Sequence, residues 1–356
     1  MSVVIVGIDE AGYGPMLGPL CIGMSAFEIA GWNEGDAAPD LWEMLDAAVC
    51  RRPSDKRKRV AIDDSKTLKL AKEGTRHPLT HLERGVLAML AAMGRPCRND
   101  EEVRAALSTV LEEHAWYGGP AISLPLEPTN ATVNMQANAL AATMAAAGVT
   151  CLDLRCVAVC EGKYNQIFAR SGKTATNELG LLSHLRHAWL HWGLAGDGQT
   201  GGEQDGGRAT TRVVCDAQSG RIRYGELLGR FLDLVKAEAR EIAVLEESEV
   251  ASRYRVSGGD GSLKRELLIS FQSAGDSRHL PIAMASMVAK LSRELAMERL
   301  NRHWIAAAAA APKAAVASAA VEVKPTAGYW EDSKRFLGQL SAVMPAATRK
   351  VMMRIG

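Results

Sequence analysis

The chain has 356 residues, is 47% hydrophobic, and carries a formal net charge of +1 at pH 7. This length allows one large domain or two smaller ones, and the near-neutral charge excludes a global basic field, so a nucleic-acid site would need a local patch. The N-terminus lacks the basic start and cleavage site of a signal peptide, and the Ala-rich run at residues 305–311 is too short to span a bilayer. We therefore expect a cytoplasmic protein with no membrane partner.

The cysteines and histidines favour ordinary structural roles. An odd number of cysteines, seven, with no export signal argues against a disulfide framework. The three cysteines within residues 151–160 match no common zinc spacing, so buried free thiols are the favoured interpretation. His184, His187 and His191 stand at helical spacing, and one side of a partly exposed helix is favoured over a metal-binding face.

In chain order, the apolar patterns alternate between strands and helices. They predict strands over residues 3–8, 21–29, 151–158, 211–215 and 267–271, with the second an antiparallel neighbour of the first. They predict helices over residues 79–93, 100–114, 134–147, 177–192, 224–238 and 281–303. This alternation indicates an α/β fold. Residues 196–210, GDGQTGGEQDGGRAT, are glycine-rich and nearly free of apolar side chains, so we expect a flexible insertion there.

Acidic residues stand at the ends of two predicted strands. The first strand, VVIVGIDE, ends in Asp9 and Glu10, and another ends at Asp216. Desolvating carboxylates is costly unless a cation or a donor compensates. A further acid, Glu294, lies on the predicted helix 281–303. Strand ends and a flanking helix can gather these four carboxylates at one sheet edge, where hard oxygen ligands suit Mg²⁺ or Mn²⁺.

The metal prediction depends on the combination of acids rather than on any one of them. Two such ions about 4 Å apart would stabilise the attacking water and the leaving oxygen in phosphodiester hydrolysis. A single Asp at a strand end is more often a turn residue. Glu294 alone would more often be a solvated helix charge paired with Arg293 or Lys290. Ser286, Lys290 and Glu294 follow one another at intervals of four and share one helix face.

Five segments in order resemble the motif set of the type 2 ribonuclease H family, ribonucleases HII and HIII: GIDEAGYGPMLGPL, DDSKTL, VVCDAQSG, GDSRHLPIAMASMVAKLSRE and AGYWEDSKRFL. They span residues 3 to about 337, and the first and fourth are quite specific. The resemblance implies a ribonuclease H-like fold, a mixed β-sheet flanked by helices, in a catalytic domain over residues 1–300. It also implies a helical segment over residues 301–356 that closes over the hybrid and includes the Ala-rich stretch 305–320, for which composition does not distinguish helix from linker.

The resemblance implies a metal-dependent endonuclease with two Mg²⁺ or Mn²⁺ ions per site. Such an enzyme hydrolyses the RNA strand of RNA–DNA hybrids, or ribonucleotides embedded in duplex DNA, and leaves 3′-hydroxyl and 5′-phosphate ends. We expect a monomer. Carried over position by position, Asp9, Glu10, Asp216 and Glu294 match the catalytic, metal-binding carboxylates.

The same resemblance implies contacts with the substrate. Gly12 and Gly14 match a glycine loop whose backbone approaches the ribose 2′-hydroxyl, the group that distinguishes RNA from DNA. The other matches are a phosphate-contacting lysine, two helix residues that face the site, and a tyrosine that stacks near the ribose at the scissile junction: Lys66, Ser286 with Lys290, and Tyr329.

The sequence departs from the family pattern at two residues. Tyr13 stands where the glycine loop commonly has arginine, so the arginine's fork to phosphate is lost and Tyr13 would stack or hydrogen-bond instead. Glu294 stands where ribonuclease HII commonly has Asp, and it resembles the HIII pattern. The altered glycine loop, together with long connecting segments, keeps open the alternative of a hybrid-binding protein with weak or no catalysis. A nuclease of the same fold with another nucleic-acid substrate also stays open, because fold does not fix function.

Three further polar features have two interpretations each. The basic run RRPSDKRKR, residues 51–59, would contact backbone phosphates or form a solvated loop, with the loop slightly favoured. Asp63 and Asp64 would contribute to the acidic site or, as favoured, act as turn residues. Asp276 is interpreted as a helix cap or a loop acid, because it precedes the predicted helix 281–303 closely.

Overall fold

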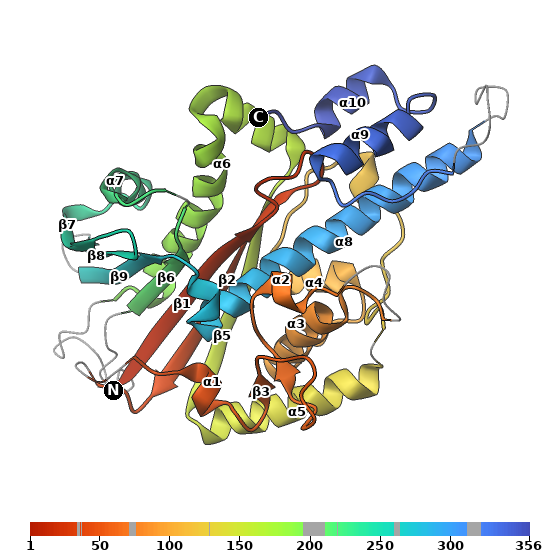
Figure 1. The fold of residues 1–356 in the computed structure, drawn as a ribbon. Coiled ribbons are helices and arrows are strands. Elements are labelled where there is room, and N and C mark those ends of the chain that lie inside the picture. Colours follow the sequence, from red (N-terminus) through yellow and green to blue (C-terminus); the bar gives the residue numbers. More distant parts are fainter. Residues whose placement is uncertain are drawn as a thin grey trace.

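A seven-stranded mixed sheet with helices on both faces is the centre of the computed structural model (Figure 1). It confirms the predicted α/β class. The structure describes residues 1–33, 36, 38–70, 76–127, 129–194, 211–218, 220–259, 264–311 and 322–356. The predicted flexible insertion at 196–210 and the part of the Ala-rich stretch at 312–320 lie outside these residues.

The strands lie side by side in an order that mixes parallel and antiparallel pairs. The order is β5 (Val149–Val159), β2 (Leu20–Ala30), β1 (Ser2–Ala11), β6 (Thr211–Asp216), β9 (Lys264–Gln272), β8 (Ala251–Gly259) and β7 (Glu238–Glu247). Strand β6 runs parallel to both β1 and β9, and the other neighbours are antiparallel. A separate parallel pair joins β3 (Val49–Cys50) to β4 (Val60–Ala61). All the predicted strands are present, and β2 is the antiparallel neighbour of β1 as predicted.

The hairpin of β7 and β8 was not predicted from the sequence. Strand β7 is largely exposed on both faces, so it has no alternating apolar pattern. Strand β8 does alternate, with Tyr254 and Val256 fully buried between more exposed neighbours, and this was the signal available in the sequence.

The helices cover the two faces of the sheet. They are α1 (Leu41–Met44), α2 (Ser65–Leu68), α3 (Thr80–Ala92), α4 (Asp100–Ala106), α5 (Asn130–Ala146), α6 (Glu161–Trp192), α7 (Gly225–Leu234), α8 (Leu280–Ala310), α9 (Trp330–Gln339) and α10 (Ala346–Met352), with 3₁₀ turns η1 (Ala115–Tyr117) and η2 (Gly275–Ser277). Helix α4 is shorter than predicted. Helix α6 begins well before the predicted residue 177 and is broken at Gly172, which has a φ of +80°. Helix α8 crosses residue 300 without a break, so the two predicted parts of the chain share it.

The alternating side chains of β1 divide the core between the two faces. Val3 and Ile5 belong to one buried cluster with residues of α3 and α8, whereas Val4 and Val6 belong to another with residues of α6 and α7.

Every cysteine is free, and those at residues 151–160 are buried, which confirms the interpretation of these cysteines as buried free thiols. Among the described residues, no helix combines the length and apolar character needed to cross a membrane.

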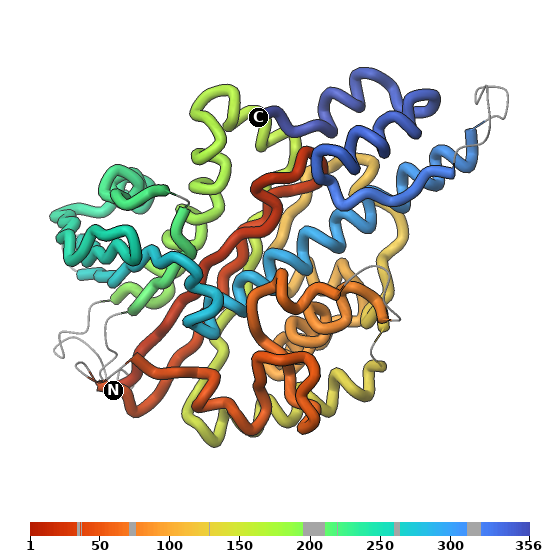
Figure 2. Tube along the Cα trace, viewed as in Figure 1, coloured from red at the N-terminus to blue at the C-terminus, as the bar shows by residue number. Residues whose placement is uncertain are grey.

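Helix α8 packs directly on the sheet. Figure 2 traces it across the strands β1 and β2. A Cβ atom at Gly7 would overlap the backbone of Pro281, and a Cβ atom at Gly23 would overlap the backbone of Ala285. Glycine at these two strand positions therefore allows the helix and the sheet to meet without intervening side chains.

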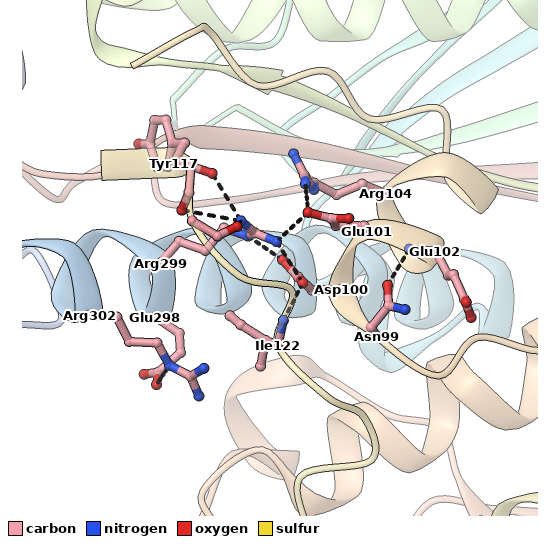
Figure 3. A network of polar contacts seen from close by, with 12 residues as sticks. Asn99, Asp100, Glu101, Glu102, Arg104, Tyr117, Ile122, Glu298, Arg299 and Arg302 are labelled. Atoms are coloured by element: carbon pink, nitrogen blue, oxygen red, sulfur yellow. Dashed lines mark hydrogen bonds and ion pairs between the residues drawn. The ribbon is translucent and has the colours of Figure 1, made fainter. Parts of the chain in front are cut away.

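A buried ion pair fixes helix α8 to the start of α4, and the same arginine binds the end of η1 (Figure 3). The Arg299 and Asp100 side chains are 2% and 1% exposed, and Arg299 Nη2 donates to Asp100 Oδ1 at 2.8 Å. Arg299 Nη1 also donates to the carbonyl oxygen atoms of Tyr117 and its two following glycines at 3.2–3.3 Å. The Asp100 carboxylate in turn accepts from the Ile122 amide at 2.7 Å. These bonds compensate the cost of burying both charges.

We predict that Arg299→Met lowers the free energy of unfolding by about 3–5 kcal/mol, because it leaves the Asp100 carboxylate buried without its cation. The matched control is Arg302→Met on the same helix, whose pair with Glu298 is about half exposed (Figure 3). That change should cost less than about 1 kcal/mol. Urea unfolding of both variants measures the difference, and equal effects would contradict the prediction.

Candidate active site

Four carboxylates from three elements meet at one edge of the sheet. Asp9 and Glu10 lie near the end of β1, and Asp216 ends the parallel strand β6, where Ile8 pairs with Cys215 one position earlier. Asp276 lies in η2, which follows β9, the other parallel neighbour of β6. The amide of the preceding residue, Gly275, donates to Asp216 Oδ1 at 3.2 Å. The four acidic side chains line one cavity of about 290 Å³.

The rest of the cavity wall comes from the loop after β1, from α2 and α8, and from the residue before α9. These lining residues are Ala11, Gly12, Tyr13, Gly14, Pro15, Ser65, Lys66, Ser286, Lys290 and Tyr329. The structure thus brings together every residue that the sequence predicted for this site, except Glu294. Their roles in catalysis and binding stay predictions.

Burial and mutual repulsion make the carboxylates of β1 and β6 reluctant to ionise. Burial raises the pKa of Asp9 well above its usual value, and the neighbouring charges of Glu10 and Asp216 raise it further, against a hydrogen bond from Ser286. Burial also raises the pKa of Glu10, again with a contribution from Asp216. These raised pKa values indicate that the negative charges of the buried carboxylates are not balanced by enough positive charge nearby.

Lys66 is the cation that acts on the acids from across the cavity. Burial raises the pKa of Asp216 and of Asp276, and the charge of Lys66 opposes both shifts. Asp64 adds to the repulsion on Asp276. Asp64 itself is the N-cap of α2, since its Oδ1 accepts from the Lys66 amide at 3.0 Å, so it is a helix-cap residue rather than the turn residue favoured from the sequence.

Glu294 lies outside the cavity lining, although it is on α8 as predicted. Its Oε1 is 2.6 Å from Lys69 Nζ and 3.0 Å from Lys290 Nζ. Burial would raise the pKa of Glu294, but Lys290 and Lys69 outweigh it and hold the pKa at about 2. The Glu294 carboxylate is therefore compensated by lysines, in contrast to the four acids in the cavity.

Asp276 is the acidic residue of the cavity that sequence reasoning did not assign to it. It does not cap α8, because the N-cap position is His279. The available signal was topological: the turn that holds Asp276 joins strand β9 to helix α8, and β9 ends at the same sheet edge as β6.

Two buried arginines donate hydrogen bonds to the backbone of the glycine loop, residues 12–18. Gly12 has a φ of +92°, and a Cβ atom there would overlap the Arg293 side chain. Arg293 Nη2 donates to the Leu17 carbonyl oxygen at 3.1 Å. Arg354, which follows α10 and is 5% exposed, donates from Nη2 to the carbonyl oxygens of Gly12, at 2.7 Å, and Pro15. These contacts fix the backbone of the loop against the cavity.

Tyr13 has a cation beside it that comes from another element. The Nζ atom of Lys173, just after the break in α6, lies 5.0 Å from the centroid of the Tyr13 ring. The loop thus lacks an arginine of its own but has a lysine next to its aromatic residue, at a distance typical of a cation–π contact.

Comparisons with known proteins give distant structural likenesses. No protein-family model and no curated protein matches the chain. A chain of the PCNA–RNase HII complex from Archaeoglobus fulgidus is 14% identical, with a TM-score of 0.41 over 99% of this chain and 94% of that one. Ribonuclease H2 from Pyrococcus horikoshii is 14% identical, with a TM-score of 0.35 and coverage of 98% and 97%. Bst-RNase HIII in complex with Mn²⁺ is 13% identical, with a TM-score of 0.32 and coverage of 98% and 69%. Similarities of this size carry no argument about activity.

We predict that Arg354→Met loosens the glycine loop, because it leaves buried carbonyl oxygens without their donor, at a cost of about 2–4 kcal/mol. Hydrogen–deuterium exchange of the peptide covering residues 10–20 should become faster. The control is Arg349→Met on α10, where the arginine is exposed. Equal exchange rates for this peptide in the two variants would show that Arg354 does not hold the loop in place.

Proposed function

We propose that this protein is a divalent-metal-dependent nuclease of the ribonuclease H type that hydrolyses the RNA strand of RNA–DNA hybrids. The observation that carries the proposal is the cavity itself, where four carboxylates from β1, β6 and η2 face two lysines and a glycine loop. Grouped acids that are insufficiently compensated would repel the phosphates of a nucleic acid. A site of this kind therefore suits phosphodiester chemistry only when cations join it.

The donor set fits a hard divalent cation. Asp9, Glu10, Asp216 and Asp276 offer carboxylate oxygens, which Mg²⁺ and Mn²⁺ prefer over the nitrogen and sulfur ligands of other metals. The pKa values of these four acids are raised because their negative charge is poorly compensated, and a bound cation would supply the missing positive charge. Among the described residues, no three such side chains already form a close metal cluster, so these side chains would turn inward on binding. Two bound ions would supply an activated water and stabilisation of the leaving oxygen.

The chain's own residues orient the substrate in this proposal. Lys66 and Lys290 would hold and neutralise the phosphate beside the carboxylates. The backbone at Gly12 and Gly14 would approach the ribose, where the 2′-hydroxyl distinguishes RNA from DNA. Tyr329 lines the cavity and is 54% exposed, so its ring is available to stack near the sugar.

Cleavage should depend on the carboxylates and on metal. We expect the parent protein to cut the RNA strand of a labelled hybrid in Mg²⁺ or Mn²⁺, and Asp9→Asn or Asp216→Asn to reduce the rate by at least about 100-fold. Added metal should raise the Tm of the parent and not of these variants. The control is Glu226→Gln on α7, at an exposed position away from the cavity.

The same assay tests the two alternatives. A duplex with a single embedded ribonucleotide and a duplex without RNA accompany the continuous hybrid. Parental rates in folded Asp9→Asn and Asp216→Asn variants would overturn the proposal. Tight binding of the hybrid without cutting would favour the hybrid-binding alternative, and cutting of other nucleic acids alone would favour a different substrate.

Asp276 and Glu294 can be distinguished as the fourth ligand. We propose that Asp276 takes this role, because it lines the cavity, whereas the Glu294 carboxylate pairs with Lys69 and Lys290. Asp276→Asn should therefore remove the rise in Tm caused by metal. Glu294→Gln should lower the Tm, because it leaves the partly buried Lys69 and Lys290 unpaired, and should keep the rise in Tm caused by metal. If Glu294→Gln removes the rise in Tm and Asp276→Asn keeps it, the result would support the sequence-based prediction that Glu294 is the fourth ligand.

A further inference from the structure

A second, larger cavity lies beside the basic run and has no role in the proposed chemistry. It measures about 640 Å³ and is lined by residues of α1 and by most of residues 51–59. Five of its lining side chains are cationic and three are acidic. The wall therefore carries a local excess of positive charge on a chain that is otherwise nearly neutral.

The ion pairs in this wall show which cations are available to a ligand. Arg57 pairs with Asp46 at 3.1 Å, and Arg59 pairs with Asp55 at 2.8 Å. Three other cations of the wall are exposed and form no ion pair with a described carboxylate: Arg51, Arg52 and Lys56. The internal pairs hold the loop in shape, while these three remain available for an anion.

Arg51 is fixed in a geometry suited to phosphate. Its guanidinium carbon lies 3.7 Å from the centroid of the Trp42 ring, and Trp42 is itself buried, with its Nε1 donating to the Ile62 carbonyl oxygen at 2.9 Å. Arg51 Nη1 donates to the Ser277 carbonyl oxygen at 2.8 Å. Stacking and one hydrogen bond orient the planar group, while its other donors make no bond to described residues. An arginine fork held in this way is well organised for two oxygens of one phosphate.

Arg51 also connects the basic run to the carboxylate cavity. Ser277, its hydrogen-bond partner, directly follows Asp276, which lines that cavity. In Figure 1, α1 and β3, which precede the basic run in the chain, lie below the start of helix α8. A nucleic acid cut at the carboxylates would therefore meet this positive surface as it leaves the cavity on the η2 side.

We propose that the basic run, residues 51–59, binds the phosphodiester backbone of the duplex next to the cleavage site. The inference rests on the proposed function and extends it by naming the surface that holds the flanking part of the substrate. Charge complementarity supports a nucleic acid as the occupant, because unpaired exposed cations and an oriented arginine match a row of phosphates. The neighbouring acids cannot attract a phosphate themselves, so flanking cations would supply affinity.

The experiment measures binding of a fluorescent hybrid duplex of about 20 base pairs by full-length protein that carries Asp9→Asn, over a series of salt concentrations. Arg52→Gln with Lys56→Gln should weaken binding about tenfold at low salt and reduce the slope of log K against log[salt] by about 1–2. Arg51→Lys keeps the charge but loses the stack and the fork, so binding should weaken about threefold with little change in slope. In the cleavage-competent protein, the effect of Arg52→Gln with Lys56→Gln should fall on KM more than on kcat.

The matched control is Arg186→Gln with Lys264→Gln, which removes the same charge from exposed positions outside both cavity walls. It should change neither the affinity nor the slope. If the parent cuts the hybrid and Arg52→Gln with Lys56→Gln behaves like the control, the basic run is a solvated loop and the proposed function stands. If the parent neither binds nor cuts any nucleic acid, both proposals fall.

Discussion

The direct contact between helix α8 and strands β1 and β2 is the constraint on which the site depends. Gly7 and Gly23 lack the Cβ atom that would overlap the helix backbone, so no side chain separates the helix from the sheet. This contact determines how close Ser286 and Lys290, on the helix, lie to Asp9 on the sheet in the wall of the cavity. A larger residue at either glycine would lift the helix, and the helix face would lose its alignment with the carboxylates.

Near this contact, one carboxylate is paired with lysines, while among the described residues the carboxylates in the cavity are not. Glu294 sits between Lys69 and Lys290, and its pKa is held at about 2. Of the lysines in the cavity wall, Lys290 pairs with Glu294, so Lys66 is the one that lowers the pKa of three of the cavity acids, and burial raises the pKa of all four. The acids of the sheet edge and the acid of helix α8 thus have pKa values shifted in opposite directions, because a carboxylate responds to the cations within a few ångströms of it.

The sequence predicted the parts of the site that depend on local pattern. The β-branched strand before Asp9 and Glu10, and the strand before Asp216, are recognisable from a few residues each. The pairing of Glu294 with Lys290, one helical turn away, was among the interpretations that the sequence offered. The position of Asp276 depends on which strand lies beside β6, and the second partner of Glu294 is Lys69, 225 residues away in sequence. Neither of these two relations leaves a periodic signal. The exposed strand β7 escaped prediction for a related reason, since it has no buried face to pattern.

The clamp on the glycine loop has a consequence for folding. Arg354 and Gly12 are 342 residues apart in sequence, and Arg293 is 276 residues from its partner in the same loop. Contacts between such distant segments form late, because a long stretch of chain must be ordered before they gain anything. The contact of helix α8 with β1 joins Gly7 to Pro281 and spans a similar stretch of chain. The shape of the loop and the packing of the core beneath it therefore depend on the same long-range closure of the chain.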